Sequence, residues 1–138
     1  MAASPAALFR RLAAAVIGVP AHLPPELRER FPELGEVRWR RGGVFVRIGG
    51  WALLQPSVAA ITLWRTVFLA PDVPWEPALL LHELRHVHQF GASRAFPALY
   101  LLESLRHGYA RNRYEADARA WAAQRLRART PSPPTEGA

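Results

Sequence analysis

Residues 74–91 read PWEPALLLHELRHVHQFG, and the hydrophobic period of the chain changes at this stretch. Upstream of it, apolar residues alternate with polar ones as in strands, whereas here they recur every three or four residues as in a helix. Glu76 and Pro77 can start this helix, and Gly91 can end it. A helix of about four turns is therefore predicted, with histidines and a glutamate carried among its apolar residues.

Two segments before this helix predict a small sheet. Residues 36–50, EVRWRRGGVFVRIGG, alternate apolar residues with arginines, and Gly42-Gly43 is placed to form the turn of an antiparallel hairpin. The alternating apolar residues of the two expected strands are Val37, Trp39, Val44, Val46 and Ile48. Residues 58–71, VAAITLWRTVFLAP, are a second β-rich stretch. A sheet of three or four strands is expected from these segments.

Helices are predicted at both ends of the chain. Ser4 and Pro5 can cap and start a helix that ends near Ile17, and residues 25–31 predict a short one. Residues 97–107 predict a further helix, and a last helix follows with Asn112 as its cap. The expected fold class is α+β: a small twisted antiparallel or mixed sheet of three to four strands, packed on the histidine-bearing helix and on further C-terminal helices.

Length and composition indicate one domain. The 138 residues suit a single domain over residues 1–129, followed by a disordered tail over residues 130–138, TPSPPTEGA. The chain has no cysteine, so disulfides, thiolate metal sites and cysteine nucleophiles are excluded. The absence of disulfides fits a reducing compartment, and a cytoplasmic location is expected.

The net charge of the chain indicates other possible kinds of binding partner. A net charge of +7 is typical of proteins that bind nucleic acid or anionic membranes. All eighteen basic residues are arginine, however, a bias that a GC-rich genome also produces, and nucleic acid is therefore not the expected partner. RRLAAAVIGVP, residues 10–20, is too short to span a bilayer. It is read as part of an amphipathic helix, with a membrane-surface anchor as the alternative.

The histidine-bearing helix has the spacing of a metal site. His82 and His86 lie four residues apart, so on a helix they project about 40° from each other, one turn apart on one face. Glu83 lies about 100° around the helix, where its carboxylate can reach a metal-bound water without binding the ion. Burying these groups among leucines is costly unless something satisfies them, and a metal does so. His88 points about 200° away from His86 and is expected to bond elsewhere.

A catalytic zinc site needs a third protein ligand. The metzincin continuation would place a histidine at position 92, where this chain has Ala92. The other solution is a carboxylate on a later helix, and Glu115 is the favoured candidate. Glu103 and His107 on the intervening helix are alternatives, with ordinary helix-surface charge as the competing interpretation.

HELRHVHQ (residues 82–89), followed by GYARNRYEADARAW (residues 108–121), resembles the gluzincin metallopeptidases, in which HExxH is joined by a glutamate from a downstream helix. The small size resembles the minigluzincins, minimal versions of that fold. The resemblance covers residues 75–125 by motif and the preceding strands by arrangement. It implies that His82, His86 and Glu115 bind Zn²⁺ and that Glu83 is the general base.

The same resemblance implies a reaction and a substrate. Zinc lowers the pKa of its water, Glu83 takes the proton, and the resulting hydroxide attacks a carbonyl of a peptide or protein. Asp117 is implied as a partner that orients a ligand histidine. Tyr109, Tyr114 or His107 is implied as a hydrogen-bond donor to the oxyanion. A strand edge within residues 61–69 is implied to hold the substrate backbone.

Two other functions stay open at the level of sequence. A zinc-stabilised interaction module would keep the ligands but lack a usable cleft. A basic protein that binds nucleic acid or a membrane surface would carry the histidine helix incidentally. A general base at Glu83 favours catalysis, because a structural zinc site does not need one. The oligomeric state is not predicted.

Overall fold

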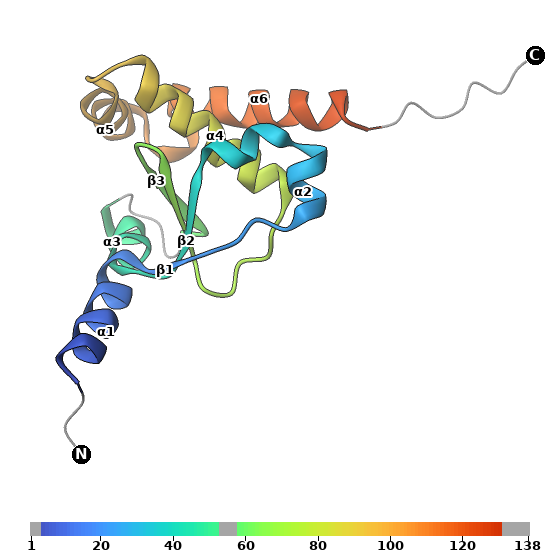
Figure 1. Cartoon of the computed structure of the whole chain (residues 1–138). Helices are drawn as coiled ribbons and strands as arrows, with labels where there is room; N and C mark the ends of the chain where they lie inside the picture. Colours follow the sequence, from blue (N-terminus) through green and yellow to red (C-terminus); the bar gives the residue numbers. More distant parts are fainter. Residues whose placement is uncertain (1–3, 53–57, 131–138) are drawn as a thin grey trace, which may run out of the picture.

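The computed structural model describes residues 4–52 and 58–130 (Figure 1). In chain order the elements are α1 (Pro5–Ile17), β1 (Val19–Pro20), α2 (Pro25–Arg30), the 3-10 helix η1 (Pro32–Glu36), β2 (Arg38–Arg41), α3 (Val44–Ala52), β3 (Ala60–Leu63), β4 (Thr66–Leu69), α4 (Pro77–Ala92), α5 (Phe96–His107), the 3-10 helix η2 (Tyr109–Arg111) and α6 (Arg113–Ala128). The α+β class is confirmed. The expected tail lies outside the described residues, apart from Thr130.

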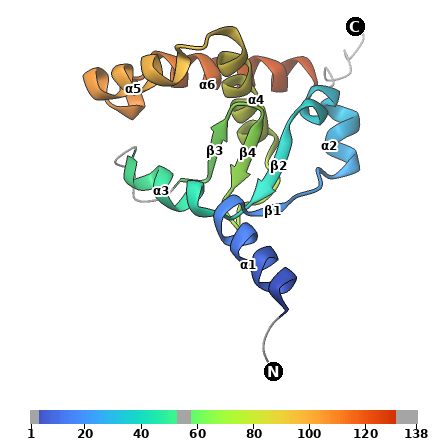
Figure 2. The same cartoon turned by 60° about the vertical axis from the view of Figure 1, so that its left-hand side comes forward.

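The sheet is mixed and has the strand order β1-β2-β4-β3. β2 pairs antiparallel with β1 and parallel with β4, and β3 pairs antiparallel with β4. β3 and β4 form a hairpin whose turn contains Trp64 at a φ of 54°. Residues 61–69 are thus two strands, and of these only β3 is an edge of the sheet among the described residues (Figure 2).

The core lies between the sheet and the C-terminal helices. α4 packs against α6 along its length and also against β3. The leucines of the predicted apolar face, Leu80, Leu81 and Leu84, are fully buried there. They pack with Phe31, Leu34 and the strand residues Val67 and Leu69. Burial of this face is what fixes α4, with its histidines, beside the edge strand.

The predicted strand at residues 44–48 is wrong, because these residues begin α3. Gly42 and Gly43 do have positive φ values, 70° and 94°, as a hairpin turn of that type would require. Both edges of β2 are already paired, however, by β1 and by β4. The chain therefore leaves the sheet after the glycines. Phe45 then packs on Phe68 of β4 at a ring-centroid distance of 5.0 Å.

The helix ends follow the sequence with two exceptions, at Gly91 and at Ser4. Asn112 caps α6, since its side chain accepts a hydrogen bond from the Tyr114 amide at 2.8 Å. Pro77 starts α4 as expected, and the helix runs one residue past Gly91. Ser4 precedes α1 but its side chain makes no capping hydrogen bond, so Pro5 alone marks that start.

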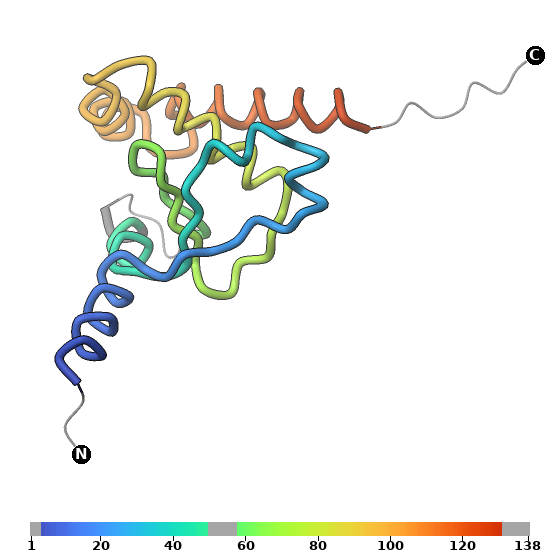
Figure 3. The backbone as a smooth tube through the Cα atoms, in the orientation of Figure 1, coloured from blue at the N-terminus to red at the C-terminus, as the bar shows by residue number. Residues whose placement is uncertain are grey.

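The chain passes directly from α1 into β1 near its N-terminus (Figure 3), and Gly18 is the one residue between these two elements. Its φ is +64°, and a Cβ there would lie only 2.3 Å from the Arg41 carbonyl oxygen. Gly18→Ala is therefore expected to lower the free energy of unfolding by about 3 kcal/mol, from backbone strain and a backbone clash together. Denaturant unfolding measures the loss. Gly35→Ala is the matched control, since nothing lies within 4 Å of a Cβ at that position. Equal denaturation midpoints for the two variants would contradict the close approach of Gly18 to the Arg41 carbonyl oxygen.

Candidate metal centre

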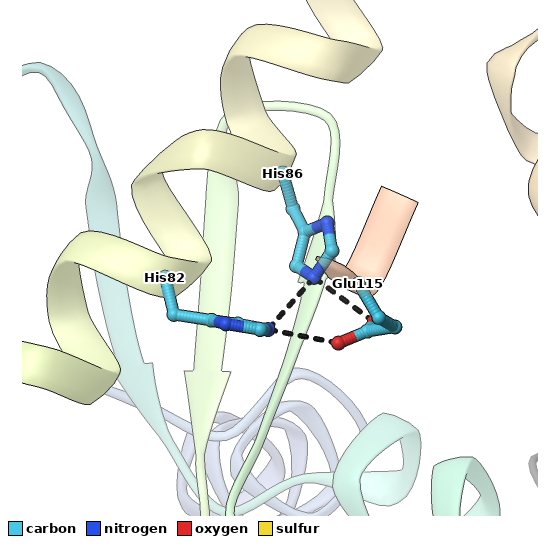
Figure 4. Close-up of side chains that lie close together, drawn as sticks. All are labelled: His82, His86 and Glu115. Carbon is cyan, nitrogen blue, oxygen red and sulfur yellow. Dashed lines mark hydrogen bonds and ion pairs between the residues drawn. The ribbon is translucent and has the colours of Figure 1, made fainter. Parts of the chain in front are cut away.

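Three side chains from two helices meet beside the edge strand (Figure 4). His82 and His86 project from successive turns of α4, and Glu115 projects from the first turn of α6. The two Nε2 atoms lie 3.1 Å apart. His82 Nε2 is 3.0 Å from Glu115 Oε2, and His86 Nε2 is 3.1 Å from Glu115 Oε1. The structure thus brings together the three residues predicted as metal ligands.

The start of α6 is held so that Glu115 faces α4. Asn112 is fully buried, and its amide nitrogen donates to the Tyr100 carbonyl oxygen at 3.2 Å and to Ser104 Oγ at 2.8 Å. Both acceptors belong to α5, so one capping residue joins α5 to the start of α6. Glu115, three residues further on, is buried as well.

The amide of Gln89 fixes the tautomer of His86. Gln89 Nε2 donates to the Tyr114 carbonyl oxygen at 3.1 Å and to Asp117 Oδ2 at 2.9 Å. Because only the amide nitrogen can donate to these two acceptors, the amide oxygen faces His86, 2.8 Å from its Nδ1. Nδ1 therefore carries a proton, and in the neutral ring the lone pair on Nε2 points into the cluster.

The groups that meet at the centre are mainly acceptors. A neutral His86 presents a lone pair there, and Glu115 presents two carboxylate oxygens. Glu115 Oε2 is buried and makes no hydrogen bond among the described residues, although His82 Nε2 lies 3.0 Å away outside hydrogen-bonding geometry. Such an arrangement is costly without a positive charge at its centre, which either a proton or a cation can supply.

The spacing of the donor atoms fits a small metal ion. A tetrahedral ion with bonds of about 2.1 Å separates its ligand atoms by about 3.4 Å. The separations of 3.0 and 3.1 Å are a few tenths of an ångström shorter. An opening of that size is within reach of side-chain rotation. Two imidazoles and one carboxylate are also a donor set used by metal sites that keep a position open.

The ionisation of the cluster depends on its own contacts. Burial acts to raise the pKa of Glu115, but the contacts with His82 and His86 outweigh it and hold that pKa well below its usual range. Burial acts to lower the pKa of His86, but the bond to Glu115 and the charges of Glu83 and Glu115 raise it to about 9. A proton thus supplies positive charge at this centre when no metal does.

Tyr100 contributes a further contact to the carboxylate of Glu115. Its hydroxyl donates to Glu115 Oε1 at 2.7 Å, and its ring packs edge-on against His86. Burial, together with the negative charge of Glu115, raises the pKa of Tyr100 far above its usual value. The phenol therefore keeps its proton and stays a donor, which leaves Oε2 as the carboxylate oxygen without a hydrogen bond.

Glu83 lies beside the cluster and is held by the edge strand. Thr62 Oγ1 on β3 donates to Glu83 Oε2 at 2.6 Å, and both side chains are buried. This bond engages one carboxylate oxygen and fixes the orientation of the other. A carboxylate that is near a metal centre but outside the ligand set has the placement of a general base.

Asp117 reaches the cluster through Gln89. Its carboxylate accepts from Gln89 and also from Arg85, with an Nε to Oδ2 distance of 2.7 Å. The bond to Arg85, together with that to Gln89, outweighs the effect of burial and lowers the pKa of Asp117. Asp117 therefore lies in a chain of contacts that orients His86, but Gln89 makes the contact with the ring.

The predicted oxyanion donors lie in different places. Tyr109 lines the groove over the cluster, and burial and the charge of Glu115 raise its pKa. The hydroxyl of Tyr114 accepts from Arg113, and its ring packs on Phe96. The side chain of His107 is 54% exposed and lies 4.0 Å from Glu103. Of the three candidates, Tyr109 is the one that the structure places beside the cluster.

Two other residues from the sequence lie outside the cluster. His88 packs edge-on against Trp121 at a ring-centroid distance of 5.4 Å, on another side of α4. Glu103 lies 3.9 Å from Arg113 on the surface of α5 and α6. Neither residue is among the described ligand groups that meet at the centre.

A groove of about 640 Å³ runs over the cluster. β3 forms one wall, α4 its floor, and α5 and α6 the opposite side. Among the described residues, its charged lining consists of Glu83, Glu115 and Arg119 beside the two histidines. The other walls are mostly apolar and include Ile61, Leu79, Phe96 and Leu126. The cluster therefore faces a largely apolar space.

No family model, curated protein or solved structure matches the chain.

Thr62, Gln89 and Tyr100 are site residues that the sequence pattern does not single out. Gln89 has a signal in retrospect, because it lies three residues after His86 and so on the same side of the helix. Tyr100 is a hydroxyl among the leucines of α5, and Thr62 alternates with apolar residues in β3. Neither has a spacing relation to the HExxH motif, because both contacts are tertiary.

Gln89→Leu is expected to weaken metal binding about tenfold to a hundredfold, because His86 loses the acceptor that fixes its ring and tautomer. Zinc titration against a competing chelator measures the change. Gln124→Leu, at an exposed position of α6, is the matched control. If Gln89→Leu binds zinc as tightly as the control, Gln89 does not orient the ligand.

Proposed function

We propose that the protein is a zinc-dependent peptidase of the gluzincin type. The observation that carries the proposal is the cluster of His82, His86 and Glu115 with Glu83 beside it and a groove above it. The cluster supplies three ligand groups for a metal, and the adjacent carboxylate is what a hydrolytic site needs beyond its ligands.

Zinc is the metal we propose, although two histidines and a carboxylate also bind iron(II) in oxygenases. The position of Glu83 favours hydrolysis, because the carboxylate is anchored by Thr62 outside the ligand set and beside it. When bound, zinc supplies Lewis-acid chemistry, in that it lowers the pKa of a coordinated water and polarises a carbonyl.

The protein's own side chains carry out the proton transfers and stabilise the charges that develop. Glu83 takes a proton from the attacking water on the oxygen that Thr62 leaves unbonded, and it can return that proton to the leaving amine. Tyr109, which keeps its proton, can donate to the developing oxyanion from the wall of the groove. Glu115 stays ionised and is held by Tyr100.

The substrate we propose is an extended peptide with apolar side chains. β3 is an edge of the sheet among the described residues and lines the groove, so its outer backbone groups can pair with a peptide laid along it. The largely apolar walls of the groove favour apolar side chains on either side of the bond to be cleaved.

Digestion of a peptide library tests the proposal. The native protein is expected to cleave next to apolar residues, to lose activity after chelation and to regain it when zinc is restored. Mass spectrometry of the products identifies the cleaved bonds. Cleavage that persists unchanged after the metal has been removed would overturn the proposal.

A further inference from the structure

α1 is a helix that the described part of the chain leaves largely uncovered. None of its residues is buried, and it projects away from the sheet in both views (Figures 1 and 2). Phe9 is 72% exposed and Leu12 is 57% exposed. The same helix is apolar over most of its length. An uncovered face of this kind marks a binding surface.

The apolar side chains of α1 form one face. At about 100° per residue, Leu8, Phe9, Leu12 and Val16 fall within an arc of about 100°. All four are exposed. Arg11 lies about 60° beyond one edge of this arc and Arg10 about 100° beyond the other, and both are exposed. Apolar residues flanked by arginines are the pattern of a helix that lies in the interface of a membrane.

Charge points to an anionic surface as the occupant. α1 contains two arginines and no acidic residue. α3 packs against α1 and adds the exposed residues Arg47 and Ile48. The whole chain carries a net charge of +7. A protein partner with an apolar groove would not need this charge, whereas anionic headgroups are attracted by it.

The attachment of α1 is rigid rather than loose. The guanidinium of Arg40 donates to the carbonyl oxygens of Ile17 and Gly18. The backbones of Gly18 and Gly43 approach so closely that a Cβ on Gly43 would lie 2.7 Å from the Gly18 nitrogen. These contacts hold the end of α1 against the sheet, so that the exposed face has a set direction relative to the body.

From these observations we infer that α1 docks the protein onto anionic lipid surfaces. Its 13 residues extend about 20 Å, too short for a bilayer, so the helix lies in the headgroup region with its apolar face inward. Among the described residues, no helix is long and apolar enough to cross a membrane. Docking through α1 does not depend on the zinc site.

Co-sedimentation of the full chain with vesicles tests the inference. Vesicles of equal parts phosphatidylcholine and phosphatidylglycerol are expected to bind the protein at least about tenfold more tightly than phosphatidylcholine alone. Phe9→Ser with Leu12→Ser, and separately Arg10→Glu with Arg11→Glu, are expected to lower that affinity at least about tenfold. These variants are expected to keep the native melting temperature, since α1 buries no side chain.

Matched controls distinguish docking through α1 from non-specific hydrophobic adsorption and from an effect of net charge. Leu105→Ser removes a leucine of α5 that is 78% exposed, and Arg28→Glu with Arg94→Glu changes the net charge as much as the α1 pair does. Both controls are expected to bind vesicles like the native protein. Equal loss in controls and α1 variants overturns the inference. Absence of vesicle binding by the native protein also overturns it. One such case is a dimer in which α1 joins two copies of the chain, and Phe9→Ser with Leu12→Ser would dissociate that dimer.

Discussion

Glu83→Gln is expected to lower kcat/KM for peptide cleavage about a thousandfold or more while leaving zinc bound. In the native protein Thr62 Oγ1 donates to Glu83 Oε2 at 2.6 Å. The amide oxygen of the variant can still accept this hydrogen bond, so the local structure is kept. It cannot take a proton from water. A thousandfold loss corresponds to about 4 kcal/mol of transition-state stabilisation.

Glu76→Gln is the control for this variant, because Glu76 is exposed at the start of the same helix. Rates for a single fluorogenic peptide, together with the zinc content of each protein, give the comparison. If Glu83→Gln cleaves as fast as the control, Glu83 is not the base. A native protein that holds zinc but cleaves nothing would instead be a zinc-stabilised interaction module.

Glu115→Gln is expected to weaken zinc binding by more than about a hundredfold, beyond the effect of losing a residue that only orients a ligand. The charge of Glu115 would balance that of a bound metal, and its Oε2 atom lacks a hydrogen bond among the described residues. The neutral amide offers a weaker ligand oxygen. Competition with a chromophoric chelator measures the affinity.

Glu103→Gln provides the same chemical change outside the cluster. Glu103 lies 3.9 Å from Arg113 and 4.0 Å from His107, both on the surface. The zinc affinity of the Glu103→Gln variant is expected to match that of the native protein. An equal loss in both variants would mean that the general charge of the protein, rather than ligation by Glu115, controls the affinity.

The parts of the fold that the sequence predicts are those with strong local signals. α4 has a helical period, a proline at its start and a buried leucine face, and α6 has the Asn112 cap. α3 has no such signal, because Val44, Val46 and Ile48 fit the period of a strand. Pairing of β2 on both edges decides that segment, and that is a tertiary property.

The same distinction applies to the candidate site. The spacing of His82 and His86 follows from one helix, so the motif alone predicts that they share a face. Glu115 was one of several carboxylate or imidazole candidates, and packing of α6 on α4 brings it to the histidines. The contacts of Gln89 with the Tyr114 carbonyl oxygen exist only once those helices pack together. No pattern in a single segment predicts them.

The metal content of the purified protein decides whether His82, His86 and Glu115 bind zinc. The protein is purified without chelator, or it is stripped of metal and then given a slight excess of zinc. Elemental analysis by inductively coupled plasma mass spectrometry is expected to find about one zinc per chain. His82→Ala with His86→Ala is expected to hold less than about a tenth of that amount. Equal zinc in the two proteins, or no zinc in the native protein, would contradict a metal centre at His82, His86 and Glu115.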